Sequence, residues 1–399
     1  MSVTAPGGFE AGGVACGIKP SGVPDLALVA TVDRRPVPAA AVFTTNLAQA
    51  APVAVSRKHL RDGHAAAVVL SSGNANAATG EPGRADARRM CEMTAAALGC
   101  ETADVLVCST GLIGMPLPMA ALEAGIPKVA AVLGSDEASG HAAAEAMLTT
   151  DTVRKEAIAS AEPAGGTSFT VGGMAKGAAM LAPAMATMLA VLTTDAAVEP
   201  LALHRALDLA VSDTFNALLV DGCTSTNDTV IALAGGAVGH APIDSEGGAF
   251  HALVASLTEV CDELATAMAA DAEGATKLAR VVVRGARSAE EARRAARAVA
   301  GSQLVQCSLY GNDPYWGRVL SELGASGSFI APERVDISYN GIVVCRNGVA
   351  MPHDELALES AMARREIEIV CDLHQGMGRA TVRFTDLTHA YVDENMGTS

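Results

Sequence analysis

The sequence predicts an α/β protein in which strands and helices alternate along most of the chain. Short apolar runs, typical of strands, are repeatedly followed by segments with apolar residues at helical spacing. Apolar residues make up 50% of the chain and aromatic residues only 3%, so Ala, Val, Leu and Met must build the core. No repeat, linker or low-complexity segment divides the 399 residues. We therefore expect one compact α/β body made of two interleaved halves.

The first half of the chain contains several strand and helix signals. Strands are predicted at residues 25–31, 39–43, 52–55, 65–70, 104–108 and 168–171. Helices are predicted at residues 82–98, which Pro82 opens, at 116–133, and at 136–148 with Ser135 as the N-cap. Loops rich in small residues follow two of the strands, at 71–80 and 109–114.

The second half alternates more clearly. Strands are predicted at residues 229–233, 280–284, 303–309, 366–372 and 379–385, and helices at 199–218, 246–270, 288–300 and through Trp316 to Gly324. Asn340-Gly341 is a strong signal for a tight hairpin turn.

The charge and the apolar runs exclude several classes of protein. The net charge is −16 and no basic cluster occurs, so we expect neither a nucleic-acid partner nor an anionic membrane. The longest apolar run, residues 178–192, is shorter than the ~20 residues that a membrane-spanning helix needs, and the first residues do not resemble a secretion signal. We expect a soluble cytoplasmic protein. Its nine cysteines are widely spaced and odd in number, which argues against disulfides and a zinc site.

One threonine stands out in that apolar run. From Ala178 to Leu192 every residue is apolar except Thr187. A buried hydroxyl without a partner costs about 1–3 kcal/mol. Thr187 is therefore either a hydrogen-bonded core threonine or a hydroxyl that is kept dry for chemistry, and the residues alone leave both interpretations open.

Other polar residues have two interpretations as well. Thr110 and Gly111 follow a predicted strand and could form an oxyanion hole from a hydroxyl and a backbone N–H, or an ordinary turn between a strand and a helix. Lys176 lies among glycines, but the spacing of a phosphate-binding loop is absent. Glu273 and Lys277 could form an ion pair at a helix end, and Asn395 and Ser399 a disordered tail.

Metal binding is not expected. Asp221, Asp228 and Glu273 are candidate ligands, but no histidine lies at ligand spacing from them. We expect these carboxylates to be solvated or to cap helices.

Separated motifs along the whole chain resemble the glutamate N-acetyltransferase (ornithine acetyltransferase) family of arginine biosynthesis. Lys176–Ala196 is similar to the segment around the family's nucleophile, although Ala179 replaces its usual glycine. The other similar motifs are Ser72–Gly80, Cys108–Gly114, Met147–Asp151, Ser225–Val230, Asp271–Lys277, Asn312–Arg318, Asp386–Val392 and Glu394-Asn395. After Asn395 the tail departs from the pattern, because it lacks a tyrosine and is one residue shorter, so Thr398 and Ser399 match less well.

The resemblance implies a layered sandwich of sheets covered by helices, of the self-cleaving N-terminal-nucleophile type. It implies cleavage between Ala186 and Thr187, which would give fragments of residues 1–186 and 187–399 in one interleaved body. Thr187 would be the nucleophile, and Thr110 and Gly111 the oxyanion hole. The substrate-binding residues implied by the resemblance are Thr150, Lys176, Thr187, Glu273, Asn395 and Ser399.

The chemistry of residue 187 agrees with this implication. A threonine hydroxyl needs a base, and a freed α-amino group has an ordinary pKa of ~7.7–8.0. Cleavage would therefore create a base beside the hydroxyl without any histidine.

The resemblance also implies the substrates and partners. It implies acetyl transfer from N2-acetyl-L-ornithine to L-glutamate without a cofactor, with acetyl-CoA as a possible second donor, and a heterotetramer of two copies of each fragment. The alternatives are a self-cleaving amidohydrolase or aminopeptidase, which passes the acyl group to water, and an uncleaved small-molecule binding protein.

Overall fold

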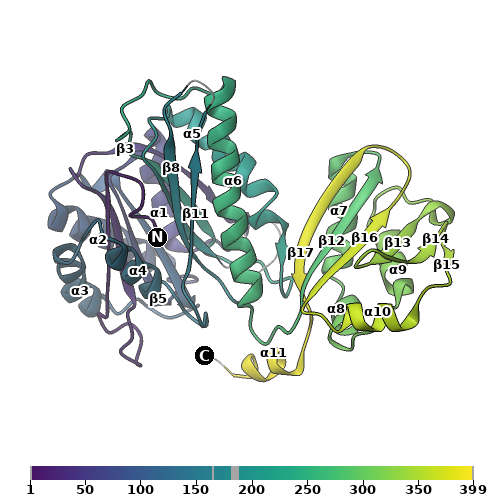
Figure 1. Ribbon diagram of the computed structural model, residues 1–399. Coiled ribbons are helices and arrows are strands. Elements are labelled where there is room, and N and C mark those ends of the chain that lie inside the picture. Colours follow the sequence, from purple (N-terminus) through teal and green to yellow (C-terminus); the bar gives the residue numbers. More distant parts are fainter. Residues whose placement is uncertain (1, 164–165, 181–187, 398–399) are drawn as a thin grey trace. The chain divides into compact units, whose positions relative to one another are not determined.

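A computed structural model describes residues 2–163, 166–180 and 188–397 of the chain (Figure 1). The described residues form two compact units, each with its own core. Unit 1 contains residues 2–177, 188–215 and 224–268, and unit 2 contains residues 178–180, 216–223 and 269–397, apart from the gaps above. Both units therefore draw on residues from each side of position 186.

Unit 1 contains two sheets. The first is four-stranded, in the order β1 (Phe9–Val14), β2 (Leu26–Thr31), β5 (Ala67–Asn74) and β6 (Val105–Leu112). The second is six-stranded, in the order β4 (His64–Ala65), β3 (Val37–Phe43), β11 (Thr229–Ala234), β9 (Leu189–Thr194), β8 (Phe169–Lys176) and β7 (Lys155–Ala161). Strand β9, which follows Thr187 closely, pairs antiparallel with β8 and parallel with β11.

The two sheets of unit 1 pack face to face with helices outside. Leu70 and Leu106 of the first sheet lie in one buried cluster with Val191 and Ile231 of the second. The other face of the first sheet packs against α1 (Ala51–His59), α2 (Gly80–Leu98) and α3 (Met119–Ala131). The remaining helices of this unit are α4 (Glu137–Ala146), α5 (Pro200–Ser212) and α6 (Gly247–Ala270).

Helix α6 approaches the second sheet closely at a glycine. A Cβ atom at Gly173 of β8 would lie 2.8 Å from Val260 and 3.1 Å from Leu264, both on α6. Helix α5 contacts β3 of the same sheet. Unit 1 is thus a layered sandwich of sheets covered by helices, and the predicted α/β class is confirmed.

Unit 2 is a single sheet with helices packed on it. The sheet is seven-stranded, in the order β10 (Leu218–Leu219), β17 (Gly378–Thr385), β12 (Leu278–Ala286), β16 (Glu366–Asp372), β13 (Asp336–Tyr339), β14 (Ile342–Arg346) and β15 (Val349–Ala350). The helices are α7 (Ala289–Ala300), α8 (Gln303–Tyr310), α9 (Trp316–Ala325), α10 (Glu355–Met362) and α11 (His389–Glu394).

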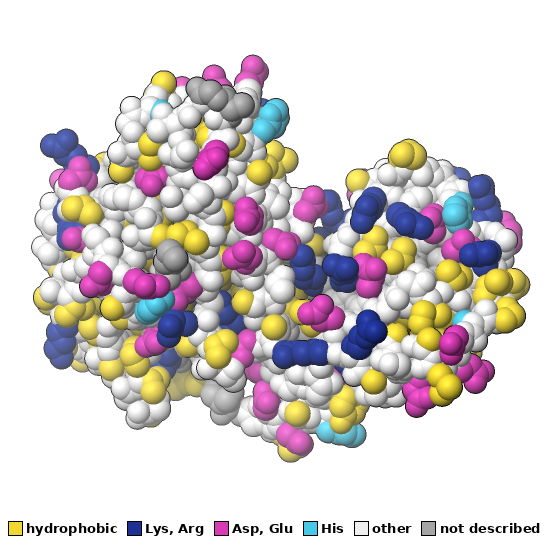
Figure 2. All heavy atoms as spheres, viewed as in Figure 1, with side chains coloured by type: hydrophobic (Ala, Val, Ile, Leu, Met, Phe, Trp, Pro, Cys, Tyr) yellow, Lys and Arg dark blue, Asp and Glu magenta, His cyan; other side chains and the backbone are white. Residues whose placement is uncertain are grey.

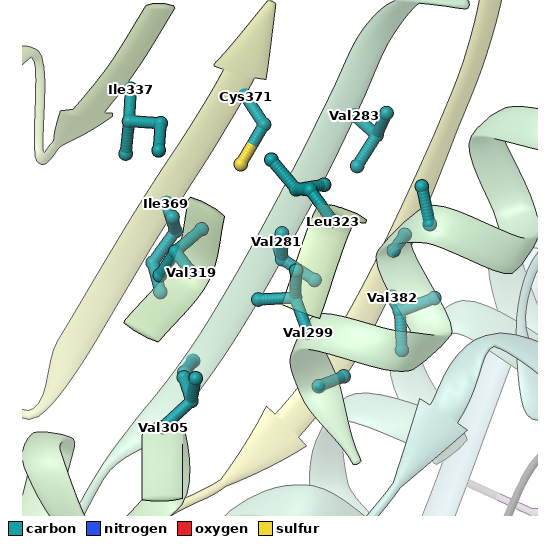
Figure 3. Packing of buried hydrophobic residues seen from close by; sticks show 14 of the residues in the cluster. Val281, Val283, Val299, Val305, Val319, Leu323, Ile337, Ile369, Cys371 and Val382 are labelled. Atoms are coloured by element: carbon teal, nitrogen blue, oxygen red, sulfur yellow. The ribbon is translucent and has the colours of Figure 1, made fainter. Parts of the chain in front are cut away.

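Strand β12 shows how the core of unit 2 forms. Val281 and Val283 are fully buried and pack with Val299 of α7, Val305 of α8 and Leu323 of α9 (Figure 3). Arg280, Val282 and Arg284 alternate with them and point to the opposite face. Val282 is buried there, whereas Arg280 and Arg284 are exposed and form ion pairs with β16. One face of this sheet is therefore apolar and the other is charged.

Most predicted elements are confirmed within a few residues. These are the strands at 25–31, 39–43, 65–70, 104–108, 168–171, 229–233, 280–284, 366–372 and 379–385, and the helices at 82–98, 116–133, 136–148, 246–270, 288–300 and 316–324. The turn at Asn340-Gly341 joins β13 to β14 as predicted. The helix predicted at 199–218 ends at Ser212, and the N-cap of α4 is Asp136 rather than Ser135. The sequence analysis did not identify several elements, among them β1, β7, β10, α10 and α11.

Two predicted strands are wrong. Residues 52–55 lie in α1, where Pro52 occupies the first turn, and residues 303–309 lie in α8. Proline is well tolerated there because the first N–H groups of a helix have no partner within the helix. In α8, Ser302 caps the N-terminus by accepting a hydrogen bond from the Val305 N–H, and Val305 and Leu309 are buried at helical spacing. In both segments the sequence analysis assigns to a strand apolar residues that the structure places in a helix.

On the face shown in Figure 2, Asp and Glu side chains are scattered over both units, whereas Lys and Arg side chains are denser over unit 2. Among the helices that the structure describes, none combines the length and the apolar composition needed to cross a membrane.

Candidate active site

Thr110 and Gly111 lie at the end of β6, where the pairing with β5 becomes irregular. Thr110 is opposite Ser72 and Gly111 is opposite Gly73, and the register shifts at the next residue. The Thr110 side chain is buried, whereas Gly111 is exposed and has a φ of +129°. A Cβ atom at Gly111 would lie 2.3 Å from the carbonyl carbon of Gly73. Position 111 therefore requires glycine on two grounds, conformation and space.

A buried asparagine fixes the strand that carries this pair. Asn227 donates hydrogen bonds through Nδ2 to the carbonyl oxygens of Ser109, at 2.8 Å, and Ala75, at 2.6 Å. Ser109 directly precedes Thr110. The Thr110 hydroxyl itself makes no hydrogen bond with the residues that the structure describes, so it is available to a substrate oxygen.

Lys176 is buried at the end of β8, beside a carboxylate. Its Nζ lies 3.7 Å from Oδ2 of Asp151, and both side chains are almost completely buried. The other oxygen of Asp151 accepts hydrogen bonds of 2.7 Å from Lys155 Nζ and from the Gly177 N–H. Burial alone would raise the pKa of Asp151, but the charges of Lys176 and Lys155 hold it well below its usual range.

Lysines act on one another beside Asp151. Burial lowers the pKa of Lys176, and the charge of Lys155 adds to this effect, although Asp151 opposes it. Burial also lowers the pKa of Lys19, and the charge of Lys176 adds to that lowering, whereas the charges of Asp25 and Asp151 oppose it. Lys155 and Lys176 thus repel each other beside a shared carboxylate, and an anionic group on a ligand would offset that repulsion.

Thr150 adjoins this cluster through the chain. It is exposed and directly precedes Asp151, whose Oδ2 also accepts a hydrogen bond from the Thr149 N–H. Thr150 is thus next to Asp151 in the chain, whereas Lys176 lies beside the Asp151 carboxylate itself.

Asp228 was expected to be solvated or to cap a helix, and this expectation is wrong. Its side chain is fully buried, and Oδ1 accepts a hydrogen bond of 2.9 Å from the Met188 N–H. Burial raises the pKa of Asp228 well above its usual range, although the Met188 N–H, the Ser225 side chain and the charge of Lys176 all lower it.

In unit 2 the structure brings Glu273 and Asn395 together. Asn395, which follows α11, donates a 2.8 Å hydrogen bond through Nδ2 to Oε2 of Glu273. The two segments also meet at Gly274, whose carbonyl accepts a hydrogen bond from the Thr388 hydroxyl. Asn395 is therefore ordered against Glu273 rather than part of a disordered tail.

The ion pair expected between Glu273 and Lys277 is wrong. The Lys277 ammonium donates instead to the backbone carbonyls of Met362 and Arg364. Glu273 remains half-buried beside Asp221, and its charge contributes to a raised pKa of Asp221, for which burial is the main cause.

Three predicted site residues lie outside the described residues. They are Ala186 and Thr187, at the expected cleavage position, and Ser399 at the end of the tail. Among the described site residues, Thr110, Gly111, Thr150 and Lys176 belong to unit 1, and Glu273 and Asn395 belong to unit 2.

The sequence analysis missed several residues that hold the site. Asp151, Lys155, Lys19 and Asn227 had no assigned role. Asp151 and Asn227 share a signal that could have found them, because each is a polar residue close to a strand and inside one of the motifs. Lys19 and Lys155 lie outside those motifs, and only the fold brings them to Asp151.

The layered fold places the protein among α/β proteins, and comparisons with known proteins show the class of enzyme. The model of the ArgJ family matches residues 10–397. Curated relatives match almost the full length. The arginine biosynthesis bifunctional protein ArgJ of Mycolicibacterium paratuberculosis is 47% identical over 99% of this chain and 96% of its own length. That of Thermobifida fusca is also 47% identical, over 99% of both chains.

A solved structure is similar over part of the chain. The crystal structure of ornithine acetyltransferase complexed with ornithine from Mycobacterium tuberculosis is 44% identical, with a TM-score of 0.41, over 46% of this chain and 94% of that chain. The family match and the full-length relatives decide the assignment: the chain belongs to the ArgJ family.

Proposed function

We propose that the chain transfers the acetyl group of N2-acetyl-L-ornithine to L-glutamate through an acetyl ester of Thr187. The family match over residues 10–397 carries this proposal. The geometry of unit 1 supports it. The buried Thr110 hydroxyl suits a reacting carbonyl oxygen, and the ammonium groups of Lys155 and Lys176 suit a carboxylate.

The enzyme first has to make its own base. In the precursor the nitrogen of Thr187 belongs to an amide and cannot accept a proton. The Thr187 hydroxyl attacks the Ala186 carbonyl, the acyl group moves from nitrogen to oxygen, and water hydrolyses the ester. The products are a carboxylate at Ala186 and a free α-amino group at Thr187, whose ordinary pKa of ~7.7–8.0 suits a base at neutral pH.

The transfer then proceeds in two half-reactions. The α-amino group takes the hydroxyl proton while the oxygen attacks the acetyl carbonyl, and Thr110 and Gly111 donate hydrogen bonds to the oxyanion. Ornithine leaves with the proton. The amine of glutamate attacks the acetyl ester through a similar oxyanion, and the hydroxyl of Thr187 is restored.

The rest of the substrate needs charged partners. We assign the carboxylate of the substrate to the lysine cluster at Lys176, with Thr150 beside it. Glu273 and Asn395 of unit 2 remain proposed substrate-binding residues on the family resemblance, and the charge of Asp221 beside Glu273 favours a cationic group there.

Intact mass and an acetyl-transfer assay test the proposal together. Wild-type protein should give two fragments, residues 1–186 and 187–399, and should transfer acetyl to glutamate. Thr187→Ala should give one uncleaved chain without transfer. Thr193→Ala is the matched control, because this buried threonine of β9 only donates a hydrogen bond to the Val3 carbonyl. It should cleave and transfer normally, and transfer by an uncleaved wild-type chain would refute the proposal.

The same assay without glutamate separates the rival hydrolase. A transferase keeps the acetyl group on the enzyme until an acceptor amine binds. Without glutamate, little acetate should therefore be released over time. Rapid acetate release that glutamate does not change would instead indicate a self-cleaving amidohydrolase.

The second donor and the assembly belong to the same proposal. The bifunctional names of the relatives favour acetyl-CoA as a donor to glutamate. A heterotetramer of two copies of each fragment, located in the cytoplasm, is the assembly that we expect. Transfer from acetyl-CoA and the mass of the native assembly test these two points.

A further inference from the structure

Lys19 is a half-buried lysine whose ammonium group uses two of its three N–H donors. Nζ donates to the carbonyl oxygen of Pro24 at 2.8 Å and to that of Leu148 at 2.7 Å. An ammonium group has three donors, and the third finds no acceptor among the residues that the structure describes. The ammonium group can therefore donate to a ligand without losing either carbonyl.

A buried aspartate fixes the loop that carries Lys19. Asp25 is 0% exposed, and its side chain accepts hydrogen bonds of 2.6–3.1 Å from four consecutive N–H groups, those of residues 16–19. The backbone carbonyl of Asp25 accepts a further hydrogen bond from the Ser72 N–H of β5. The loop is therefore tied to β5 directly before Gly73, and the backbone of Lys19 is held in one place.

The stem of Lys19 lies against the strand next to the proposed oxyanion position. A Cβ atom at Gly73 would lie 3.0 Å from Cγ of Lys19 and 3.2 Å from Cγ2 of Ile18. Gly73 is in turn opposite Gly111 in the pairing of β5 with β6. The absence of a side chain at Gly73 thus lets the loop approach β5 beside Gly111. All these residues belong to unit 1.

The ammonium end of Lys19 lies near the lysine that we assign to the substrate carboxylate. It binds the carbonyl of Leu148, in the segment that leads to Asp151. Its pKa is lowered mainly by burial, and the charge of Lys176 lowers it further, against the charges of Asp25 and Asp151. Two ammonium groups that repel each other both gain from a carboxylate placed beside them. Lys19 therefore suits the same anionic group as Lys176.

We propose that Lys19 is a further substrate-binding residue, whose third N–H donates to the α-carboxylate of N2-acetyl-L-ornithine and then to that of L-glutamate. This inference rests on the proposed function. In an N2-acetyl amino acid only the amide nitrogen and one carbon separate the reacting carbonyl from the α-carboxylate. The side chain of Lys19 likewise begins beside the proposed oxyanion position and ends near Lys176. Lys19 thus favours acetylated α-amino acids over acetylated amines that lack a carboxylate.

The test compares donors with and without the carboxylate in two variants that each lose one positive charge. Lys19→Gln removes the charge and keeps an N–H donor for the carbonyl oxygens of Pro24 and Leu148. Lys128→Gln is the matched control, because Lys128 is exposed and its charge acts on Cys16, at the start of the same loop. The second donor is N-acetylputrescine, which has a hydrogen atom where N2-acetyl-L-ornithine has its carboxylate. The measurements are kcat and KM for both donors, the cleaved fraction and Tm.

Lys19→Gln should raise KM for N2-acetyl-L-ornithine about 10- to 100-fold, because a charge-assisted hydrogen bond is lost, and should keep kcat within about twofold. Its kcat/KM for N-acetylputrescine should equal that of the wild type, since this donor has no carboxylate for Lys19 to bind. Self-cleavage involves no substrate, so both variants should give the two fragments. Lys128→Gln should keep the wild-type kcat and KM for both donors.

Reductive methylation of the wild-type protein, mapped by mass spectrometry, needs no variant and decides the question if Lys19→Gln does not fold. Saturating N2-acetyl-L-glutamate should slow the methylation of Lys19 and leave that of Lys128 unchanged. Lys19 that resists methylation without a ligand, or reacts equally fast with it, overturns the inference. In either case its ammonium group does not meet the carboxylate.

The kinetic outcomes separate the two proposals. An unchanged KM for N2-acetyl-L-ornithine in Lys19→Gln overturns the inference and leaves the proposed function intact. Equal losses of kcat/KM for both donors also overturn it, because Lys19 would then only support the fold. The inference fails as well if Lys128→Gln loses as much affinity for N2-acetyl-L-ornithine. If the wild-type protein neither cleaves nor transfers, both proposals fail.

Discussion

At the scale of single residues, backbone conformation and space decide which residue can occupy position 111, the proposed oxyanion position. Gly111 and Gly114 both have a positive φ, of +129° and +86°. A Cβ atom at Gly114 would meet nothing within 4 Å, whereas one at Gly111 would collide with the backbone of β5. Alanine variants at these two positions therefore separate the energetic cost of a positive φ from that of a steric clash.

Gly111→Ala should lower kcat by about 100-fold or more, because the clash displaces the strand end that carries Thr110 and Gly111. Gly114→Ala should lower the free energy of unfolding by about 1 kcal/mol, because alanine disfavours a positive φ, and should keep the wild-type kcat. Steady-state kinetics and urea unfolding of both variants check this. Equal losses of kcat would mean that the position of β5 does not matter to the oxyanion.

Sequence reasoning proposed candidate site residues but could not predict the partners that the structure gives them. Lys176, Thr110 and Glu273 stood in recognisable motifs. That Lys176 shares Asp151 with Lys155 was not predictable, because the contact depends on how β7, β8 and the loop before β7 come together. Burial of Asp228 was missed for the same reason, since a polar residue before an apolar strand is more often exposed.

At the scale of elements, helix α1 protects the edge of a sheet. Strand β6 is the last strand of the four-stranded sheet, so one side of it has no partner strand. The Ser56 hydroxyl donates to the Val107 carbonyl and accepts from the Val107 N–H, both at 2.7 Å, and His59 Nδ1 lies 2.8 Å from the Val105 carbonyl. Side chains of the helix thus satisfy the backbone of the strand that ends at Thr110.

Ser56→Ala should destabilise the protein by about 1–3 kcal/mol, because it leaves a buried N–H and a buried C=O without partners. Lys58→Ala, at an exposed position of the same helix, should change the stability by less than about 0.5 kcal/mol. Chemical denaturation of both variants provides the comparison. A negligible effect of Ser56→Ala would show that water replaces the serine at this edge.

Helix α1 also shows the limit of pattern reading. Residues 52–55 alternate Val and Ala after a proline, which is compatible with a strand in isolation. They form a helix because Ala51 and Val55 pack into the core on the outer face of the first sheet. Long elements with caps or turn signals, such as α7 and the hairpin at Asn340, were predictable because local signals alone determine them.

At the scale of the whole molecule, the chain forms two units where the sequence suggested one body. The single tryptophan, Trp316, packs against the core of unit 2. Asp151 and the lysines around it belong to unit 1. Tryptophan fluorescence therefore reports on unit 2, whereas far-UV circular dichroism reports on both units.

Acid should destabilise unit 1 through Asp151. The lysines hold the pKa of Asp151 below its unfolded value of about 3.9, so its stabilising effect is complete above that pH and is lost as the pH falls further. Between about pH 4 and 2 the urea midpoint should fall more by circular dichroism than by Trp316 fluorescence.

Asp151→Asn provides the variant for this test. It should cost about 3–5 kcal/mol, because it leaves buried cations unpaired, and it should flatten the acid response. Asp33→Asn, at an exposed position, should behave like the wild type. An acid response that stays unchanged in Asp151→Asn would assign the effect to other carboxylates.

Strand pairing around β9 has a consequence for the life of the cleaved protein. Strand β9 pairs with β8 along Val171–Lys176 and with β11 along Thr229–Ala234. If the chain is cut before Thr187, β8 and β9 belong to different polypeptides and still share one sheet. Halves made on one ribosome would then remain together until the molecule is degraded. A damaged half could not be exchanged for a new one, and the cell would have to replace the enzyme as a whole.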